Sequence, residues 1–232
     1  MRMRGVLCAL GLLLLISCVA SSPSGQGEAS GSALGSGKAL LISDEDATSW
    51  AQAHTSVGTP SGGVIELSCD WLWLNGCGAV EILYDRDGEV RTFFSASVCE
   101  LNGKLRLVAM SNASVWLCAQ LDDDVWHRLA ISVDLEEQRF TTAADKTDSP
   151  CIDIPIGSEA NLLQRPLYVR FTSYPELESE FMVDNIAIAD AESTLLEERW
   201  DEFEVGSLPE SPWGVYIEGD ASATVELVDA TL

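Results

Sequence analysis

Short runs of alternating apolar and polar residues dominate the chain between about residues 39 and 190. In Val64–Leu74, the side chains of Ile65, Leu67, Cys69, Trp71 and Trp73 fall on one face, and Glu66, Ser68 and Asp70 fall on the other. A period of two over runs of this length is typical of half-buried β-strands, and no long stretch carries a helical period. The pattern therefore predicts an all-β fold.

The predicted strands are separated by turn residues. Asp87-Gly88 and Asn102-Gly103 are strong hairpin signals because both dipeptides tolerate positive φ. About ten short antiparallel strands at this spacing predict a two-sheet sandwich. The expected strands are Val64–Leu74, Val80–Tyr84, Val90–Phe94, Leu105–Met110, Val115–Leu121, Trp126–Asp134, Arg139–Ala143, Leu167–Ser173 and Phe181–Ala189.

The N-terminus has the pattern of an export signal. Arg2 and Arg4 precede an apolar run, Gly5–Ile16, that is too short to span a bilayer. The run ends in Leu15-Ile16-Ser17-Cys18, which resembles the lipobox of bacterial lipoproteins. The resemblance implies that residues 1–17 are removed and that Cys18 carries the lipid which anchors the protein to a membrane. An ordinary secretory leader with an incidental cysteine is the alternative.

The next segment, residues 18–37, is rich in Ser, Gly and Ala and predicts a flexible tether. Val19 follows the cysteine, so the Asp that retains lipoproteins at the inner membrane is absent. The expected location is the bacterial cell envelope, at the outer membrane or the cell surface. Residues 38–232 are then expected to form the folded domain.

Charge narrows the choice of partners. Thirteen Lys and Arg stand against 37 Asp and Glu, for a net charge of -24. Nucleic-acid binding is disfavoured because it needs a basic surface. A hydrophobic content of 47% is enough for a packed core, and two histidines leave little material for a His-based metal site or triad.

Five cysteines remain once Cys8 leaves with the leader and Cys18 is lipidated. An exported domain meets an oxidising compartment, so disulfides are expected, and the odd number leaves at least one cysteine free or paired between chains. Cys69 and Cys77 flank an Asn75-Gly76 turn and are the preferred local pair.

Three segments resemble laminin G-like, concanavalin A-like domains. Trp126–Asp134 is similar to a strand that opens with Trp, Phe181–Ile188 to the closing V-D-N-I strand, and Gly37–Ile42 to an early strand. The resemblance covers about residues 37–190 and implies a jelly-roll sandwich that binds a glycan or another protein. It also implies that Trp126 belongs to the core, and His127 is then expected to be a rim residue.

The C-terminal segment, residues 200–232, departs from this family order. Phe203–Pro209 followed by Trp213 is similar to the segment that normally precedes the first strand of such domains. Either the domain is circularly permuted, with residues 200–232 pairing beside the Leu40 strand, or the segment begins a truncated second repeat. Permutation is favoured, because an orphan segment would expose a large apolar surface.

Few residues are candidates for catalysis or for binding a metal or a sugar. Related glucanases carry carboxylates at alternate positions of one strand, and no such set occurs here in a predicted strand. Asp122, Asp123 and Asp124 are a candidate calcium site or a solvated acidic turn, so calcium is the one cofactor that the sequence suggests. Trp71 and Trp73 are a candidate sugar-stacking platform or part of the core.

The function predicted by fold analogy is non-catalytic binding of a glycan or an envelope protein by a lipid-anchored sandwich. A divergent polysaccharide-degrading enzyme and a purely structural envelope lipoprotein are the alternatives.

Overall fold

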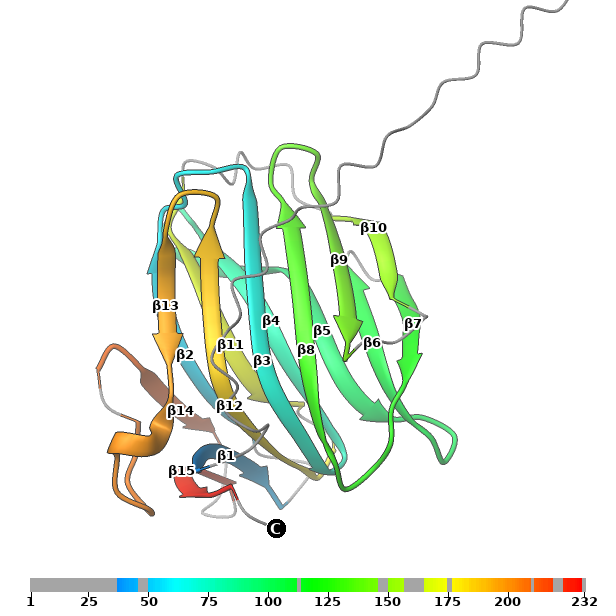
Figure 1. Cartoon of the computed structure of the whole chain (residues 1–232), viewed down its shortest axis with the longest axis vertical. Coiled ribbons are helices and arrows are strands. Elements are labelled where there is room, and N and C mark those ends of the chain that lie inside the picture. Colours follow the sequence, from blue (N-terminus) through cyan, green and yellow to red (C-terminus); the bar gives the residue numbers. More distant parts are fainter. Residues whose placement is uncertain are drawn as a thin grey trace, which may run out of the picture. The chain divides into compact units, whose positions relative to one another are not determined.

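In the computed structural model, two antiparallel β-sheets face each other across one hydrophobic core (Figure 1). The structure describes residues 37–45, 50–111, 114–145, 150–156, 165–174, 177–209, 211–218 and 223–230. The prediction of an all-β, two-sheet antiparallel sandwich is confirmed. The leader, Cys18 and almost all of the tether lie outside the described residues, as do parts of several loops.

One sheet has the strand order β10-β9-β8-β3-β12-β1-β15, with β13 also paired to β12. Its strands are β1 (Lys38–Asp44), β3 (Val64–Asn75), β8 (Trp126–Asp134), β9 (Arg139–Ala144), β10 (Cys151–Pro155), β12 (Ser179–Asp190), β13 (Thr194–Glu198) and β15 (Ala223–Asp229). We call it the eight-stranded sheet. A short 3₁₀ turn, η2 (Trp200–Glu202), follows β13.

The other sheet has the order β14-β2-β11-β4-β5-β6-β7. Its strands are β2 (Trp50–Gly58), β4 (Cys77–Arg86), β5 (Glu89–Glu100), β6 (Leu105–Ser111), β7 (Ser114–Gln120), β11 (Leu167–Ser173) and β14 (Gly214–Glu218). We call it the seven-stranded sheet. The sequence did not predict β2, because its core side is built from the weakly apolar Ala51 and Ala53.

The core forms where the inward faces of the two sheets meet. Trp71 of β3 stacks on Phe181 of the adjacent β12, with ring centroids 4.3 Å apart and planes 6° from parallel. Gly78 of β4 faces this pair, and a Cβ there would lie 2.8 Å from Cζ2 of Trp71. The close approach of the two sheets at this point therefore requires glycine at position 78.

In β8 the side chain of the first residue, Trp126, points away from the core, contrary to expectation. His127 is buried with Leu129, Ile131 and Val133, whereas Trp126 is only half-buried and lies on the outer side with Arg128. The expectation that Trp126 belongs to the core is wrong, because strand parity places it opposite to the apolar series.

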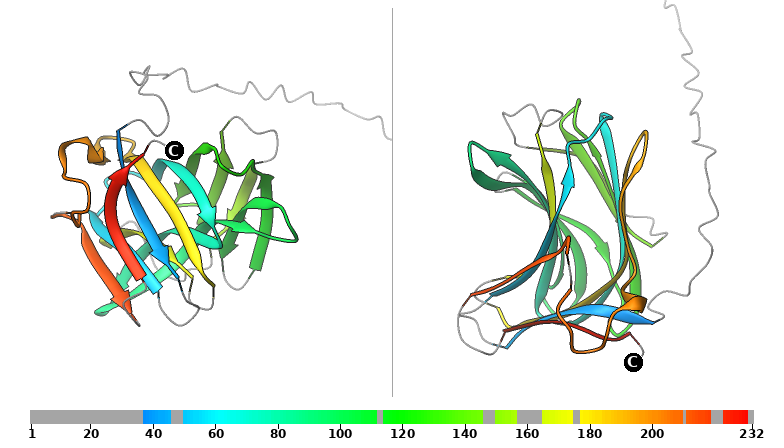
Figure 2. Two further views of the ribbon diagram at one scale, coloured as in Figure 1. Left: turned by 90° about the horizontal axis from the view of Figure 1, so that it is seen from below. Right: turned by 90° about the vertical axis from the view of Figure 1, so that its left-hand side faces the viewer.

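The last strand lies beside the first. β15 pairs antiparallel with β1, with Leu227 opposite Leu40, and β14 pairs with β2 in the other sheet. Figure 2 shows β15 in red, β1 in blue and β12 in yellow side by side. Trp200 and Trp213 are buried in the common core. Within the described residues, the C-terminal segment thus contributes strands to both sheets of this sandwich.

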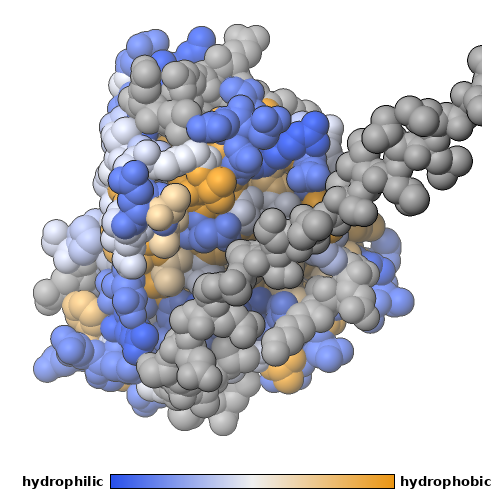
Figure 3. Space-filling model, turned by 45° about the horizontal axis from the view of Figure 1, so that its top comes forward, coloured by the Kyte–Doolittle hydropathy of each residue, from blue (hydrophilic) through white to orange (hydrophobic). Residues whose placement is uncertain are grey.

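The two sheets diverge toward the end of the sandwich that carries the β8–β9 and β12–β13 hairpins (Figure 2). A surface view of this end shows hydrophobic residues gathered between rims of hydrophilic ones (Figure 3). In the part of the chain that the structure describes, no helix is long and apolar enough to cross a membrane.

Candidate functional site

The two tryptophans considered as a sugar platform do not form one. Trp71 has 0% of its surface exposed and is stacked in the core. Trp73 is half-buried against the core, and its Nε1 donates to the carbonyl of Gly76 at 3.0 Å. The platform interpretation of Trp71 is therefore wrong, because the face that Trp71 shares with Leu67 and Cys69 is the inner face of the sheet.

The predicted Cys69–Cys77 pair is also wrong. Cys77 is bonded to Cys99, its direct neighbour on β5, with Cα atoms 4.2 Å apart, and Cys118 is bonded to Cys151 with Cα atoms 5.0 Å apart. Cys69 is a free, fully buried thiol. The reason is topological: the Asn75-Gly76 corner carries the chain from one sheet to the other, so β3 and β4 are not hairpin partners.

The odd cysteine count is accounted for by Cys69. Burial in the core raises the pKa of its thiol to about 12, so this cysteine is chemically inert in the folded protein. The Cys118–Cys151 disulfide has a clear structural role, because it joins β7 at the edge of one sheet to β10 at the edge of the other.

The acidic turn considered for calcium is tied to the fold by a histidine. Asp122, Asp123 and Asp124 are exposed, and the carbonyl of Asp122 accepts a hydrogen bond from Nε2 of His127 at 2.7 Å. Nδ1 of His127 lies 2.6 Å from a carboxylate oxygen of Asp145. Among the described residues, no group of three or more His, Cys, Asp or Glu is placed to hold a metal ion. The geometry thus gives calcium no support at this turn, and His127 is a buried anchor rather than a rim residue.

Two carboxylates of the eight-stranded sheet face each other. Asp70 of β3 lies opposite Asp184 of β12, with 1% and 2% of their surfaces exposed. Asp70 accepts hydrogen bonds from Arg128 at 2.8 Å and from the Asn185 amide at 2.7 Å. Burial, followed by the charge of Asp70, raises the pKa of Asp184 to about 6, against the backbone hydrogen bond from Asn185. This network joins three strands and is closed to a polymeric substrate.

A set of polar side chains, from the buried Glu81 to the exposed Thr92, lies on the face of the seven-stranded sheet that points away from the core. Arg170 of β11 donates to the Glu81 carboxylate of β4 from both Nε and Nη2, the former at 2.7 Å. Its Nη1 donates to Gln52 of β2 at 3.2 Å, and its Nη2 also donates to Thr92 of β5 at 3.3 Å. We call Gln52, Glu81, Thr92 and Arg170 the polar row.

An aromatic pair adjoins the polar row. Trp50 and Tyr216 meet edge to face, with centroids 6.0 Å apart, and both donate hydrogen bonds to one oxygen of Glu218. The Arg170 guanidinium lies 5.9 Å from the centroid of Trp50. We call Trp50, Tyr216 and Glu218 the aromatic corner. Tyr216 is 44% exposed, so the corner presents an aromatic surface to solvent.

Sequence reasoning missed this surface because its members come from five strands. The aromatic corner depends on β14, which pairs with β2 only because the C-terminal segment returns to the sandwich. Arg170 is opposite Glu81 in the register of β11 and β4, and on β2 it is opposite His54, two residues along the strand from Gln52. Trp50 was the single signal that could have drawn attention to β2.

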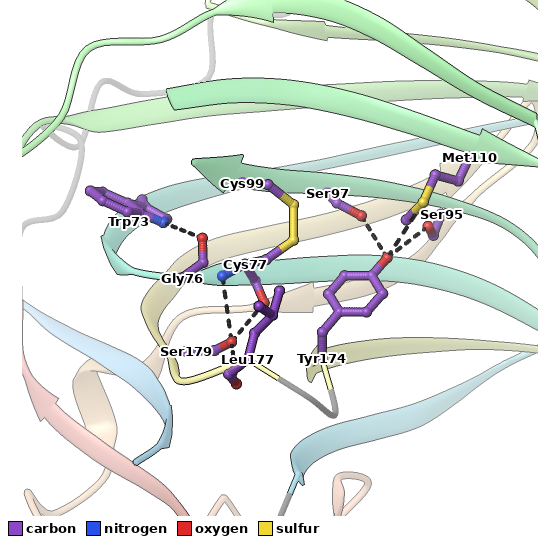
Figure 4. Close-up of a disulfide and its surroundings, with 10 residues drawn as sticks. All are labelled: Trp73, Gly76, Cys77, Ser95, Ser97, Cys99, Met110, Tyr174, Leu177 and Ser179. Atoms are coloured by element: carbon purple, nitrogen blue, oxygen red, sulfur yellow. Dashed lines mark hydrogen bonds between the residues drawn. A yellow bond between two sulfur atoms is a disulfide. The ribbon is translucent and has the colours of Figure 1, made fainter. Parts of the chain in front are cut away.

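Tyr174 bounds the polar row on the side of β5 and β6. Its hydroxyl lies 2.9 Å from Oγ of Ser97, 3.5 Å from Oγ of Ser95 and 3.9 Å from Sδ of Met110 (Figure 4). The Cys77–Cys99 disulfide lies next to it, and Ser179 is hydrogen-bonded to both backbone groups of Cys77. Burial raises the pKa of Tyr174, so the phenol acts here as a neutral hydrogen-bonding group.

Next to Thr92 the surface opens into a pocket of about 260 Å³, between β5 and the ends of β6 and β7. Phe93, Met110 and Val115 are among its lining residues, together with the hydroxyl-bearing residues Thr92 and Ser95. Thr92 belongs to both the pocket and the polar row. The aromatic corner, the polar row and the pocket therefore form one candidate binding surface across the seven-stranded sheet.

No family model matches the sequence, and no curated protein matches it. The laminin G-like and lipobox resemblances thus stay predictions. Several solved structures are similar to the sandwich at low identity. A sialidase matches at 9% identity and a TM-score of 0.49, over 66% of this chain and 15% of the sialidase. The native heptameric SAP-like pentraxin from Limulus polyphemus matches at 10% identity and 0.48, over 68% of this chain and 77% of the pentraxin.

The carbohydrate binding module CBM66 from Bacillus subtilis matches at 13% identity and a TM-score of 0.35, over 59% of this chain and 95% of the module. At these values the likenesses carry no argument about what this chain binds.

Proposed function

We propose that this protein is a lipid-anchored bacterial cell-envelope protein whose sandwich binds a glycan, without catalysing a reaction, on the outer face of the seven-stranded sheet. The observation that carries the proposal is the aromatic corner, in which Trp50 and Tyr216 are held by Glu218 beside the Arg170 guanidinium.

The chemistry of this surface suits a sugar. A pyranose offers an apolar ring face and a rim of hydroxyls, and aromatic rings combined with a few fixed polar groups recognise that combination. The polar row supplies both kinds of partner, since Gln52 and Thr92 can donate and accept while Glu81 accepts. The Arg170–Glu81 pair fixes these groups before a ligand arrives, which lowers the entropic cost of binding.

The way in which the carboxylates on this face are used supports a non-catalytic role. Both Nε and Nη2 of Arg170 donate hydrogen bonds to the Glu81 carboxylate, and Glu218 accepts hydrogen bonds from both Trp50 and Tyr216. Glycoside hydrolysis needs one carboxylic acid that still carries its proton, next to a second carboxylate. On this face Glu81 and Glu218 are each engaged by donors of the protein itself, which suits a binding surface.

Anchoring rests on the sequence alone. A lipid on Cys18 followed by the Ser- and Gly-rich tether would hold the sandwich at a distance from the membrane. An exposed binding surface on a tethered domain suits a role in contact with envelope or environmental glycans.

A glycan array probed with the intact chain in calcium-containing buffer tests the proposal. We expect binding to one class of saccharide, and loss of that binding in Trp50→Ala. The matched control is Trp126→Ala, which removes a half-buried tryptophan from the outer side of the other sheet and should leave binding unchanged. A blank array, or equal loss in both variants, would overturn the glycan proposal and favour an envelope protein as the partner.

A further inference from the structure

The pocket beside Thr92 has a composition unlike that of the rest of the protein. The chain carries a net charge of -24, yet none of the described residues that line the pocket has an ionisable side chain. Its lining combines the apolar residues Phe93, Met110 and Val115 with the hydroxyl-bearing residues Thr92 and Ser95. A pocket of about 260 Å³ is large enough for one substituent of a sugar and too small for a chain of sugars.

This lining selects for an uncharged group. A carboxylate in the pocket would find no cation there, because no described lining residue is ionisable. The guanidinium of Arg170 donates to Thr92, but it is already bonded to Glu81. An ammonium group would find no anion there for the same reason, and burial of an unpaired charge is unfavourable. The ligand group must also be partly apolar, to cover Phe93, Met110 and Val115, and able to hydrogen-bond with hydroxyls.

The pocket and the proposed glycan surface are continuous. Thr92 lines the pocket and accepts a hydrogen bond from Arg170, and Ser95 lies opposite Glu81 in the register of β4 and β5. Ser95 of β5 lies at the level of His54 of β2, four residues along the strand from Trp50, and three strand spacings away. With about 4.8 Å per strand spacing and about 3.3 Å per residue, the diagonal path from Trp50 to Ser95 is roughly 20 Å. An oligosaccharide lying across the strands can therefore contact the aromatic corner at one end and fill the pocket at the other.

We propose that the pocket holds the acetamido group of an N-acetylated sugar in an otherwise neutral oligosaccharide bound along the polar row. The amide offers one donor and one acceptor to the hydroxyls, and its methyl group covers the apolar wall. This inference rests on the proposed glycan-binding function and assigns the substrate class of the same surface.

Two ligands that differ only in this group make the test. Triacetylchitotriose and cellotriose share one backbone and linkage, and only the first carries acetamido groups. We expect calorimetric titration of the intact chain to give about fourfold tighter binding of triacetylchitotriose, the gain expected for burying one methyl group.

Two surface variants link that preference to the pocket. Val115→Asp places a carboxylate in the pocket wall at a side chain that is 60% exposed, and it should abolish the preference. Val90→Asp makes the same change at a 56% exposed position outside the pocket and should preserve it. Equal affinity for the two trisaccharides, or a preference that survives Val115→Asp, overturns the inference while the proposed function stands. Binding of neither trisaccharide together with a blank array overturns both.

Discussion

Leu40 of the first described strand lies directly opposite Leu227 of the last, and both side chains are fully buried. Residues separated by almost the whole length of the domain therefore share one part of the core. The Phe203 carbonyl and Asp201, both between β13 and β14, accept hydrogen bonds from Lys38 at the start of β1, which ties the two ends of the domain together a second time. This is the arrangement required if residues 200–232 complete the sandwich instead of beginning another domain.

The first prediction concerns the pairing of β15 with β1. Leu227→Ala removes a fully buried side chain from the β1–β15 pair and should lower the free energy of unfolding by about 2–5 kcal/mol. Urea denaturation followed by tryptophan fluorescence measures the change. Glu226→Ala, one residue away on the opposite face of β15, is the control and should have little effect. A Leu227→Ala variant as stable as the control would contradict the role assigned to β15.

The second prediction concerns the edge disulfide. Cys118→Ser combined with Cys151→Ser should cost about 3 kcal/mol, because the bridge closes a separation of 33 residues and joins the edges of the two sheets. Chemical denaturation measures the loss. In a chain with Cys8 and Cys18 replaced by Ser, we also expect one reactive thiol on unfolding without reductant and none before it, because the remaining free cysteine is the buried Cys69. Three reactive thiols on unfolding would mean that a disulfide is absent.

The fold class was predictable because it depends on local patterns. Strand parity placed Leu67, Cys69 and Trp71 on one inward face, and the Asp87-Gly88 dipeptide forms the turn between β4 and β5. The disulfides were not predictable, because they depend on which sheet each strand joins. A hairpin at Asn75-Gly76 would bring Cys69 and Cys77 onto adjacent strands, whereas the observed corner separates them into different sheets.

The candidate site was unpredictable for a related reason. Arg170, Glu81 and Gln52 are far apart in the chain, and their alignment follows only from the order β2-β11-β4. Tyr216 reaches Trp50 through β14, a strand of five residues in a segment for which the sequence left two interpretations open. Non-local pairing of this kind leaves no signal in the composition or periodicity of any one segment.

The third prediction uses the raised pKa of Asp184. A carboxyl whose pKa in the folded protein is about 6 binds its proton more tightly than in the unfolded chain. The group therefore contributes stability at low pH, and that contribution is lost as the pH rises through 6. Between about pH 5 and pH 7.5 the Asp184 contribution should fall by about 1 kcal/mol, with allowance for solvent screening.

Asp184→Asn should flatten this part of the stability profile, because the amide cannot ionise but keeps an oxygen for the Asn185 backbone. Thermal melting across the pH range provides the measurement. Glu66→Gln, which removes an exposed carboxylate from the same sheet, should leave the slope of the wild type intact. Parallel profiles for the wild type and Asp184→Asn would show that the buried carboxyl pair does not titrate in this range.

The fourth prediction tests the anchor. If the lipobox is processed, Cys18→Ser removes the thiol that would carry the lipid and should move the protein from the membrane fraction to the soluble fraction of the cell envelope. Fractionation followed by immunoblotting gives the result, with Cys8→Ser as the control because Cys8 lies in the apolar part of the leader. A Cys18→Ser protein that stays in the membrane fraction would exclude lipidation at this position as the means of attachment.

The fifth prediction concerns the contact that positions the aromatic corner. Gly214 of β14 lies opposite His54 of β2, and a Cβ at position 214 would lie 2.8 Å from Nε2 of the imidazole. Gly214→Ala should therefore push β14 away from β2, and Tyr216 with it. We expect a loss of about 1–3 kcal/mol of stability, typical of overpacking, and weaker glycan binding.

The matched rescue is His54→Ala in the same chain. Removing the imidazole frees the space that the alanine methyl needs, so the double variant should recover most of the stability and binding that Gly214→Ala loses. Removing the His54 side chain should cost little stability, because its buried Nδ1 has no hydrogen-bond partner among the described residues. A double variant no better than Gly214→Ala would show that the His54–Gly214 contact does not set the position of Tyr216. Additive losses in the double-mutant cycle would lead to the same conclusion.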